Sequence, residues 1–166
     1  MKDTLLAYFT KIKRDPFILI YIIAIASGIA TLGSLYYGFF GDIALNIQDG
    51  ILFPDGGGLE PCTLCWYSRI LMYPTFFISM VAIFKRDIKA VDYILPLSFL
   101  GIILSSYHYF IQKFPNQSLA QCSSNVPCTA LQVNYWGVFT IPFLALCAYI
   151  VIFTCVLIQR NKNAKS

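Results

Sequence analysis

A polar loop changes into a long apolar run at Cys62-Thr63-Leu64-Cys65-Trp66-Tyr67-Ser68-Arg69. The two cysteines have the C-x-x-C spacing that can close a small disulfide ring. A helix beginning here would aim backbone N–H groups at the sulfurs, and this positive helix end favours the thiolate that attacks disulfides. Arg69 follows Cys65 by four residues, so a helix places both on one face and adds a permanent positive charge. Trp66 and Tyr67 are typical of a membrane–water boundary. The stretch therefore predicts a redox-active dithiol at the edge of a bilayer.

The composition is that of a membrane protein. Of the 166 residues, 58% are hydrophobic and 12% are charged, and the mean hydropathy is +0.68. A soluble domain of this size would carry about 25% charged residues. A formal charge of +4 is also found in nucleic-acid-binding proteins, but its distribution along the chain indicates membrane topology instead. The length is that of one domain with room for four or five short-looped spans.

The apolar runs predict an all-α fold, an integral membrane four-helix bundle that forms one domain over residues 1–166. Ala24-Ile25-Ala26 resembles a signal-peptidase site, but the apolar run continues past it, so we expect a retained first helix. A short interfacial helix is weakly indicated from Ile43 to Leu52. The expected spans and outer loops, in chain order, are helices at about 17–40, 66–84, 93–112 and 137–159, and outer loops at about 41–65 and 113–136.

The basic residues predict the orientation of these helices. Ten of the twelve lysines and arginines lie in the N-terminal segment, in the turn at 85–92 or in the C-terminal tail. Only Arg69 and Lys113 lie on the other side of the membrane. By the positive-inside rule, both termini are cytoplasmic (N-in/C-in) and both cysteine-bearing loops face outward.

The six cysteines divide into two groups. Cys147 and Cys155 lie eight residues apart within one apolar run, too far along a helix for a disulfide, and we expect them to be buried, inert thiols. The other four lie in or beside the outer loops: Cys62, Cys65, Cys122 and Cys128. Redox activity is one interpretation of these four. A zinc site is another, although five residues separate the second pair where zinc sites usually have two to four. Structural disulfides that hold the loops are a third.

Two polar side chains are expected inside the membrane near the C-x-x-C motif. A charge such as Arg69 within a span indicates function by default, although it can also extend to the lipid headgroups. His108 is the only histidine and is expected at about the depth of Arg69. It could form a polar wall of a small-molecule pocket and donate a proton near neutral pH. The alternative is an interfacial histidine that is hydrogen-bonded among its neighbours, Ser105, Ser106 and Tyr107.

A dithiol at the end of an apolar bundle needs an acceptor for two electrons and two protons. Within a bilayer, the available two-electron acceptor is a quinone. The haem-attachment motif C-x-x-C-H and the Rossmann fingerprint are both absent from the sequence. The residues therefore predict a membrane thiol oxidase that is coupled to a lipid-soluble acceptor.

The chain also resembles the family of disulfide bond formation protein B (DsbB), most closely its shorter branch, BdbC. The resemblance covers all four expected helices and both outer loops. The matching stretches are Gly33-Ser34-Leu35-Tyr36, Cys62-x-x-Cys65-Trp66-Tyr67-x-Arg69-Ile70-Leu71-Met72-Tyr73-Pro74, Tyr107-His108-Tyr109, Cys122-x-x-x-Val126-Pro127-Cys128, and Trp136-Gly137 through Ile141-Pro142-Phe143-Leu144-Ala145-Leu146.

The resemblance implies a quinone-dependent thiol:disulfide oxidoreductase in the cell membrane, with its active site on the extracytoplasmic side. Its partner would be a thioredoxin-fold dithiol oxidase, and its cofactor menaquinone or ubiquinone. Cys122 would form the mixed disulfide with the partner, and Cys128 would then exchange with Cys62. Cys65 would donate electrons to the quinone.

The resemblance further implies that Arg69 polarises a quinone oxygen, and we expect His108 and Trp66 to line the same site. Two other functions remain open. A protein similar to vitamin K epoxide reductase also pairs a four-helix bundle with two cysteine pairs, but there the quinone-facing C-x-x-C lies on the last helix. A non-enzymatic tetraspanning protein with disulfide-held loops is the third possibility.

Overall fold

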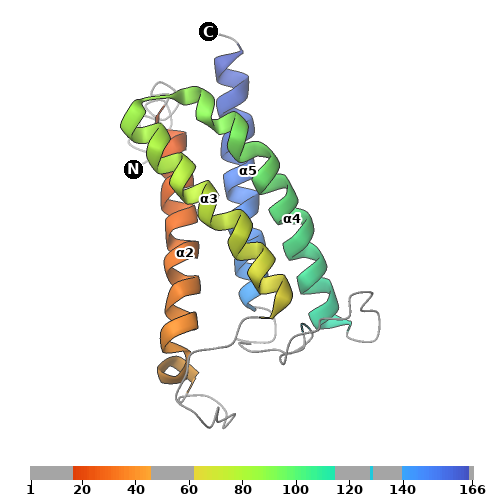
Figure 1. Ribbon diagram of the computed structural model, residues 1–166. Helices are drawn as coiled ribbons and strands as arrows, with labels where there is room; N and C mark the ends of the chain where they lie inside the picture. The colour runs from red at the N-terminus through yellow and green to blue at the C-terminus, as the bar shows by residue number, and fades with distance from the viewer. Residues whose placement is uncertain (1–16, 46–61, 115–127, 129–139, 165–166) are drawn as a thin grey trace, which may run out of the picture.

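The computed structural model describes residues 17–45, 62–114, 128 and 140–164, and every regular element in these residues is helical (Figure 1). Four helices are long and apolar enough to cross a membrane. This confirms the predicted all-α, four-helix membrane architecture. The elements in chain order are α2 (Ile18–Leu45), α3 (Thr63–Lys85), the 3₁₀-helix η1 (Ile88–Ala90), α4 (Val91–Lys113) and α5 (Ile141–Asn163).

Two helices begin at positions that differ from the predicted ones. α3 starts at Thr63 rather than near Trp66, because Cys62 adopts the extended backbone of an N-cap. α5 starts at Ile141, after the extended residue Thr140 and with a proline in its first turn, where proline is tolerated, and the predicted start at Gly137 lies outside the described residues. Most of the expected interfacial helix at 43–52 lies outside the described residues.

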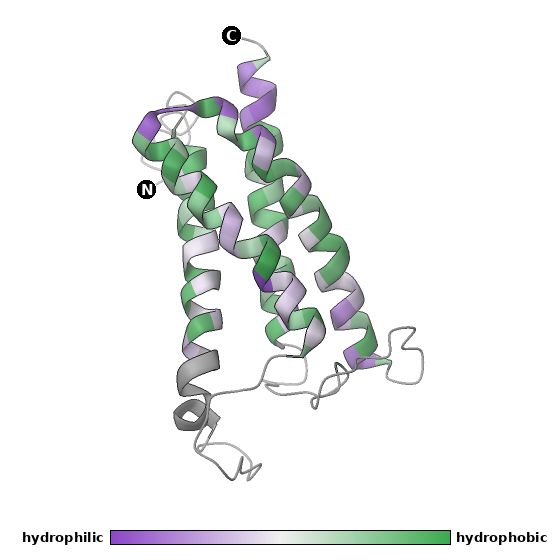
Figure 2. Ribbon diagram, in the orientation of Figure 1, coloured by the Kyte–Doolittle hydropathy of each residue, from purple (hydrophilic) through white to green (hydrophobic). Residues whose placement is uncertain are grey.

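The core of the bundle is formed by apolar side chains from all four long helices. α2 packs against α3 and α5, and α4 packs against α3 and α5. Large apolar side chains also cover the outside, as expected for a surface that faces lipid, and Figure 2 shows this hydrophobic colouring along the helices. The fully buried large residues include Ile20, Ile23, Ile94, Tyr149 and Ile152.

The hydrophilic end of the bundle is formed by the α3–α4 turn and the end of α5 (Figure 2). Arg86 caps α3 in the left-handed conformation (φ 51°), and the Asp87 carboxylate accepts a hydrogen bond of 2.9 Å from the Lys89 N–H. Arg160 forms an ion pair of 3.0 Å with Asp92, which joins the end of α5 to the start of α4. The C-x-x-C motif lies at the opposite end of α3. The two ends of the bundle therefore differ in chemistry.

One close contact sets the spacing of α3, α4 and α5. Tyr149 is fully buried, and its hydroxyl donates a hydrogen bond of 2.8 Å to the backbone carbonyl of Ser68. Its ring lies against Gly101, where an added Cβ would overlap the ring atoms. Glycine at this position therefore makes the room that lets Tyr149 reach α3 one turn below Cys65.

We predict that Gly101→Ala destabilises the bundle by about 1–3 kcal/mol, the usual cost of overpacking a core. Thermal unfolding in detergent measures the effect. Gly33→Ala is the matched control, because a Cβ at Gly33 meets no atom within 4 Å and alanine favours a helix. Equal unfolding temperatures for the two variants would contradict the assigned role of Gly101.

Candidate active site

The start of α3 brings the two cysteines of the C-x-x-C motif together. Cys62 is the N-cap and Cys65 lies in the first turn, and their sulfurs are 3.1 Å apart. This separation is longer than the roughly 2.05 Å of a disulfide bond, and both residues are free cysteines. The pair is therefore present as a dithiol.

His108 reaches this dithiol from the last turns of α4. Its Nε2 lies 3.6 Å from the Cys62 sulfur, and its side chain is buried. The hydroxyl of Ser105 is buried without a hydrogen-bond partner, so it does not anchor the histidine. His108 therefore contacts a cysteine of the C-x-x-C motif, and Ser105, one of the three neighbours named as its possible hydrogen-bond partners, does not bond to it.

The surroundings of Cys62 favour its thiolate. Hydrogen bonding from the Cys65 side chain, and then from His108, holds the pKa of Cys62 well below the ordinary cysteine range, against the opposing effect of burial. The start of α3 adds backbone amide dipoles of the same sign. The thiol therefore loses its proton at a lower pH than a free cysteine, and the nucleophilic form is populated near neutrality.

Cys128 lies beside this pair. It packs with Cys62, Leu64 and Ile111 in a small buried cluster at this end of the bundle. Cys128 is disulfide-bonded, whereas Cys62 and Cys65 are free. Cys122, the other predicted redox residue of that loop, lies outside the described residues. The structure thus brings one cysteine of the second pair next to the first.

A cavity of about 350 Å³ opens on the other side of the dithiol, and Cys65, Arg69 and His108 all line it. Residues of α2 and α5 complete its wall, most of them apolar. Ile29 and Leu144 belong to this wall and are also exposed on the outer surface. The wall of the cavity therefore includes exposed apolar residues of both α2 and α5.

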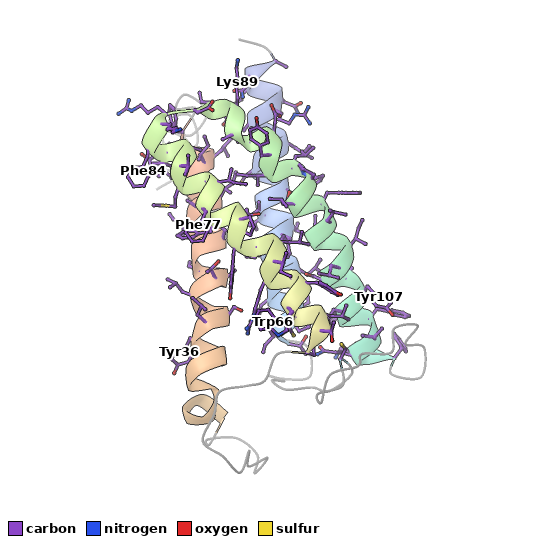
Figure 3. All side chains as sticks on the ribbon, viewed as in Figure 1. Tyr36, Trp66, Phe77, Phe84, Lys89 and Tyr107 are labelled. Atoms are coloured by element: carbon purple, nitrogen blue, oxygen red, sulfur yellow. The ribbon has the colours of Figure 1, made fainter. Side chains whose placement is uncertain are left out.

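Arg69 is held within the bundle. Its guanidinium donates a hydrogen bond of 3.3 Å to the Ser34 carbonyl of α2, and its Cζ lies 5.6 Å from the centre of the Trp66 ring. Trp66 itself is 53% exposed and is absent from the described cavity wall. Figure 3 places it at the end of the bundle opposite Lys89. Trp66 therefore contacts the predicted cofactor site only through Arg69.

The sequence did not single out three residues that shape this site. Ser34 accepts the hydrogen bond from Arg69, Ser105 presents an unpaired hydroxyl in the cavity wall, and Tyr149 holds α3 through Ser68. Serines and tyrosines are ordinary in membrane helices, so their type carries no signal. Ser34 appeared in the sequence only within the motif Gly33-Ser34, and Ser105 only as a possible hydrogen-bond partner of His108.

Cys147 and Cys155 lie on α5, and neither is among the residues that line the cavity. Cys155 is buried, as predicted, but Cys147 is exposed on the outer surface. The prediction of burial is therefore wrong for Cys147, because its position on the helix faces outward rather than toward a neighbouring helix.

The lowered pKa of Cys62 predicts its reactivity. In the reduced protein, alkylation of Cys62 by iodoacetamide should reach half its maximal rate well below the roughly pH 8.5 of an ordinary cysteine. The rate falls as the pH drops through the lowered pKa, because the thiolate is then protonated. Peptide-level mass spectrometry over a pH series measures this, with the denatured protein as control. His108→Ala should shift the pH profile of Cys62 alkylation to higher pH. If the native and denatured proteins gave the same profile, the lowered pKa of Cys62 would be contradicted.

Comparison with known proteins supports the resemblance that the sequence indicated. The family model described as "Disulfide bond formation protein DsbB" matches residues 35–159. "Disulfide bond formation protein C" of Bacillus subtilis is 40% identical over 147 residues, covering 87% of this chain and 95% of that protein. "Probable disulfide formation protein C" of Halalkalibacterium halodurans is 43% identical over 135 residues, covering 80% and 87%. No solved structure matches the chain.

The family match includes the C-x-x-C motif, Arg69, His108 and both cysteines of the second pair. The structure adds four membrane-spanning-type helices and a reduced dithiol beside a disulfide-bonded cysteine. The chain belongs to the DsbB family of disulfide bond formation proteins, and it is a multi-pass membrane thiol:disulfide oxidoreductase.

Proposed function

We propose that this protein oxidises a secreted thioredoxin-fold dithiol oxidase and passes the electrons to a membrane quinone. One observation carries the proposal: the Cys65 thiol lines an apolar cavity that Arg69 and His108 share and whose wall includes the exposed residues Ile29 and Leu144. Oxidation of two thiols to a disulfide releases two electrons and two protons. In this proposal, the quinone enters the cavity from the bilayer and reaches the Cys65 thiol without passing through water.

The residues of the cavity fit a quinone head group. Small-molecule sites are concave, mostly apolar and about 300–1,000 Å³ in volume, with a few convergent polar groups. This cavity has that size and character, with Arg69, His108 and the unpaired hydroxyl of Ser105 as its polar groups. A bound quinone, menaquinone or ubiquinone, would supply the two-electron acceptor.

Arg69 and His108 have separate roles in this proposal. The guanidinium of Arg69 presents several donors in a rigid plane, so it can hold a carbonyl oxygen while it keeps its bond to Ser34. The imidazole of His108 lies within reach of the Cys62 sulfur and can take or return a proton at Nε2. The Trp66 ring contacts the Arg69 guanidinium by a cation–π interaction and so helps to hold it in position.

The two cysteines of the C-x-x-C motif also have separate roles. Cys65 faces the cavity, whereas Cys62 is absent from the described cavity wall and packs beside Cys128. Cys62 is therefore the thiol placed for exchange with the second pair. We propose that Cys122 and Cys128 form that pair and that Cys122 takes up the reduced partner in a mixed disulfide. The two electrons then pass from the reduced Cys122 and Cys128 to a Cys62–Cys65 disulfide, which becomes the dithiol that reduces the quinone.

The proposed orientation places this chemistry outside the cytoplasm, on the side of the secreted partner. The described basic residues of the α3–α4 turn and of the end of α5 lie at the end of the bundle opposite the dithiol. The positive-inside rule then supports cytoplasmic termini and an extracytoplasmic site. A disulfide-forming enzyme needs that side, because the cytosol keeps thiols reduced.

The direct test measures quinone reduction. The purified protein in detergent, without oxygen, should reduce an added ubiquinone or menaquinone analogue at the expense of a reduced dithiol, with one disulfide formed per quinol. Cys65→Ser should lower this rate at least 100-fold, because no second thiol is left to close the disulfide. Cys147→Ser is the matched control and should keep the full rate. Dithiol oxidation without quinone reduction would overturn the quinone proposal but leave the family assignment intact.

A second prediction separates a quinone-binding Arg69 from one that only anchors the helix. Arg69→Lys keeps the charge but loses the planar set of donors, so the apparent KM for quinone should rise about five- to 150-fold, corresponding to about 1–3 kcal/mol for a charge-assisted hydrogen bond. Disulfide exchange with the dithiol, measured without quinone, should stay near normal. An unchanged KM in both Arg69→Lys and Arg69→Ala would make Arg69 an anchor.

A further inference from the structure

Three potential metal ligands converge at the start of α3. Within the described part of the chain, the sulfurs of Cys62 and Cys65 and a ring nitrogen of His108 all lie within 4.8 Å of one another. The two sulfurs are 3.1 Å apart, and His108 Nε2 is 3.6 Å from the Cys62 sulfur. Cys62 and His108 are buried, and they come from two different helices.

This triangle is close to the geometry that a tetrahedral zinc ion requires. Bond lengths of about 2.3 Å to sulfur and 2.0–2.1 Å to nitrogen place two sulfur ligands about 3.8 Å apart and a sulfur and a nitrogen about 3.6 Å apart. The Cys62–His108 distance already has this value. Cys65 needs a shift of about 1 Å, which a change of its side-chain torsion in the first helical turn can supply.

We propose that the reduced C-x-x-C pair and His108 form a binding site for one thiophilic divalent cation of the Zn²⁺ or Cd²⁺ class. Both thiols lose their protons to solvent on binding, so the two thiolates neutralise the ion and neutral His108 donates its Nε2 lone pair. The fourth position faces the cavity that Cys65 lines, where a water molecule or the free hydroxyl of Ser105 can complete the set.

The oxidation state of the pair controls this site. Once Cys62 and Cys65 form a disulfide, neither sulfur is a thiolate and the site is lost. The bound ion in turn occupies both sulfurs, so neither can attack a disulfide. Arg69, which lines the same cavity, opposes the cation by charge, so the site binds only when both thiolates are present. Metal binding would therefore hold the pair reduced and block its reaction both with the quinone and with the second cysteine pair.

The test titrates Zn²⁺ against a chromophoric chelator in the detergent-purified, reduced full chain. One equivalent should bind to the reduced protein. The oxidised wild-type protein serves as the control and should bind none. His108→Ala should weaken binding at least ten-fold. Mutating a residue that only supports a metal ligand already lowers metal affinity by about 10–100-fold. Cd²⁺ should give a thiolate-to-metal absorption band that Cys62→Ser abolishes.

Two further variants locate the ion. Cys147→Ser should bind as the wild type does, because that thiol is outside the triangle. Cys122→Ser/Cys128→Ser keeps the C-x-x-C pair and should also retain the full equivalent. The proposal is overturned if this double variant loses binding, if the oxidised protein binds equally well, if His108→Ala is unchanged, or if the reduced protein binds no ion. Binding is read without quinone or partner, so its failure is separate from failure of the proposed electron transfer.

Discussion

The hydrocarbon interior of a bilayer offers no hydrogen-bond partners, and the rest of this structure depends on that constraint. Each span must satisfy its own backbone, so each is a helix. The polar side chains inside the spans follow the same rule. Ser27, Thr75 and Ser98 donate to carbonyls one turn earlier in their own helices. Unpaired polar atoms are therefore informative, and the hydroxyl of Ser105 lies in the wall of the cavity that Cys65 also lines.

The same constraint places the chemistry at one end of the bundle. A thiolate and a guanidinium are costly at the centre of a membrane and tolerable near its surface. The C-x-x-C pair lies at the start of α3, and His108 lies in the last turns of α4, so two antiparallel helices bring a nucleophile and an imidazole together. Tyr149 and Gly101 hold these helices at the spacing that the contact requires.

The dithiol stands between two different environments. Cys65 faces an apolar cavity, and Cys62 faces the buried cluster that contains Cys128. In the function proposed above, two electrons would enter through Cys62 and leave through Cys65. The two residues between the cysteines of the C-x-x-C motif keep the sulfurs close enough to form a disulfide, although the two side chains face different neighbours.

The sequence by itself determined the helical class, the four spans and the C-x-x-C motif, because hydropathy and C-x-x-C spacing are local signals. It placed Arg69 and His108 near the motif but left the contacts of both open. Only the tertiary structure decided that His108 meets Cys62, that Ser34 holds Arg69, that Trp66 lies beside rather than in the cavity, and that Cys147 faces outward. These facts depend on the rotation of each helix about its axis. A helix that is apolar on nearly all sides carries almost no signal for that rotation, so packing against its neighbours settles it.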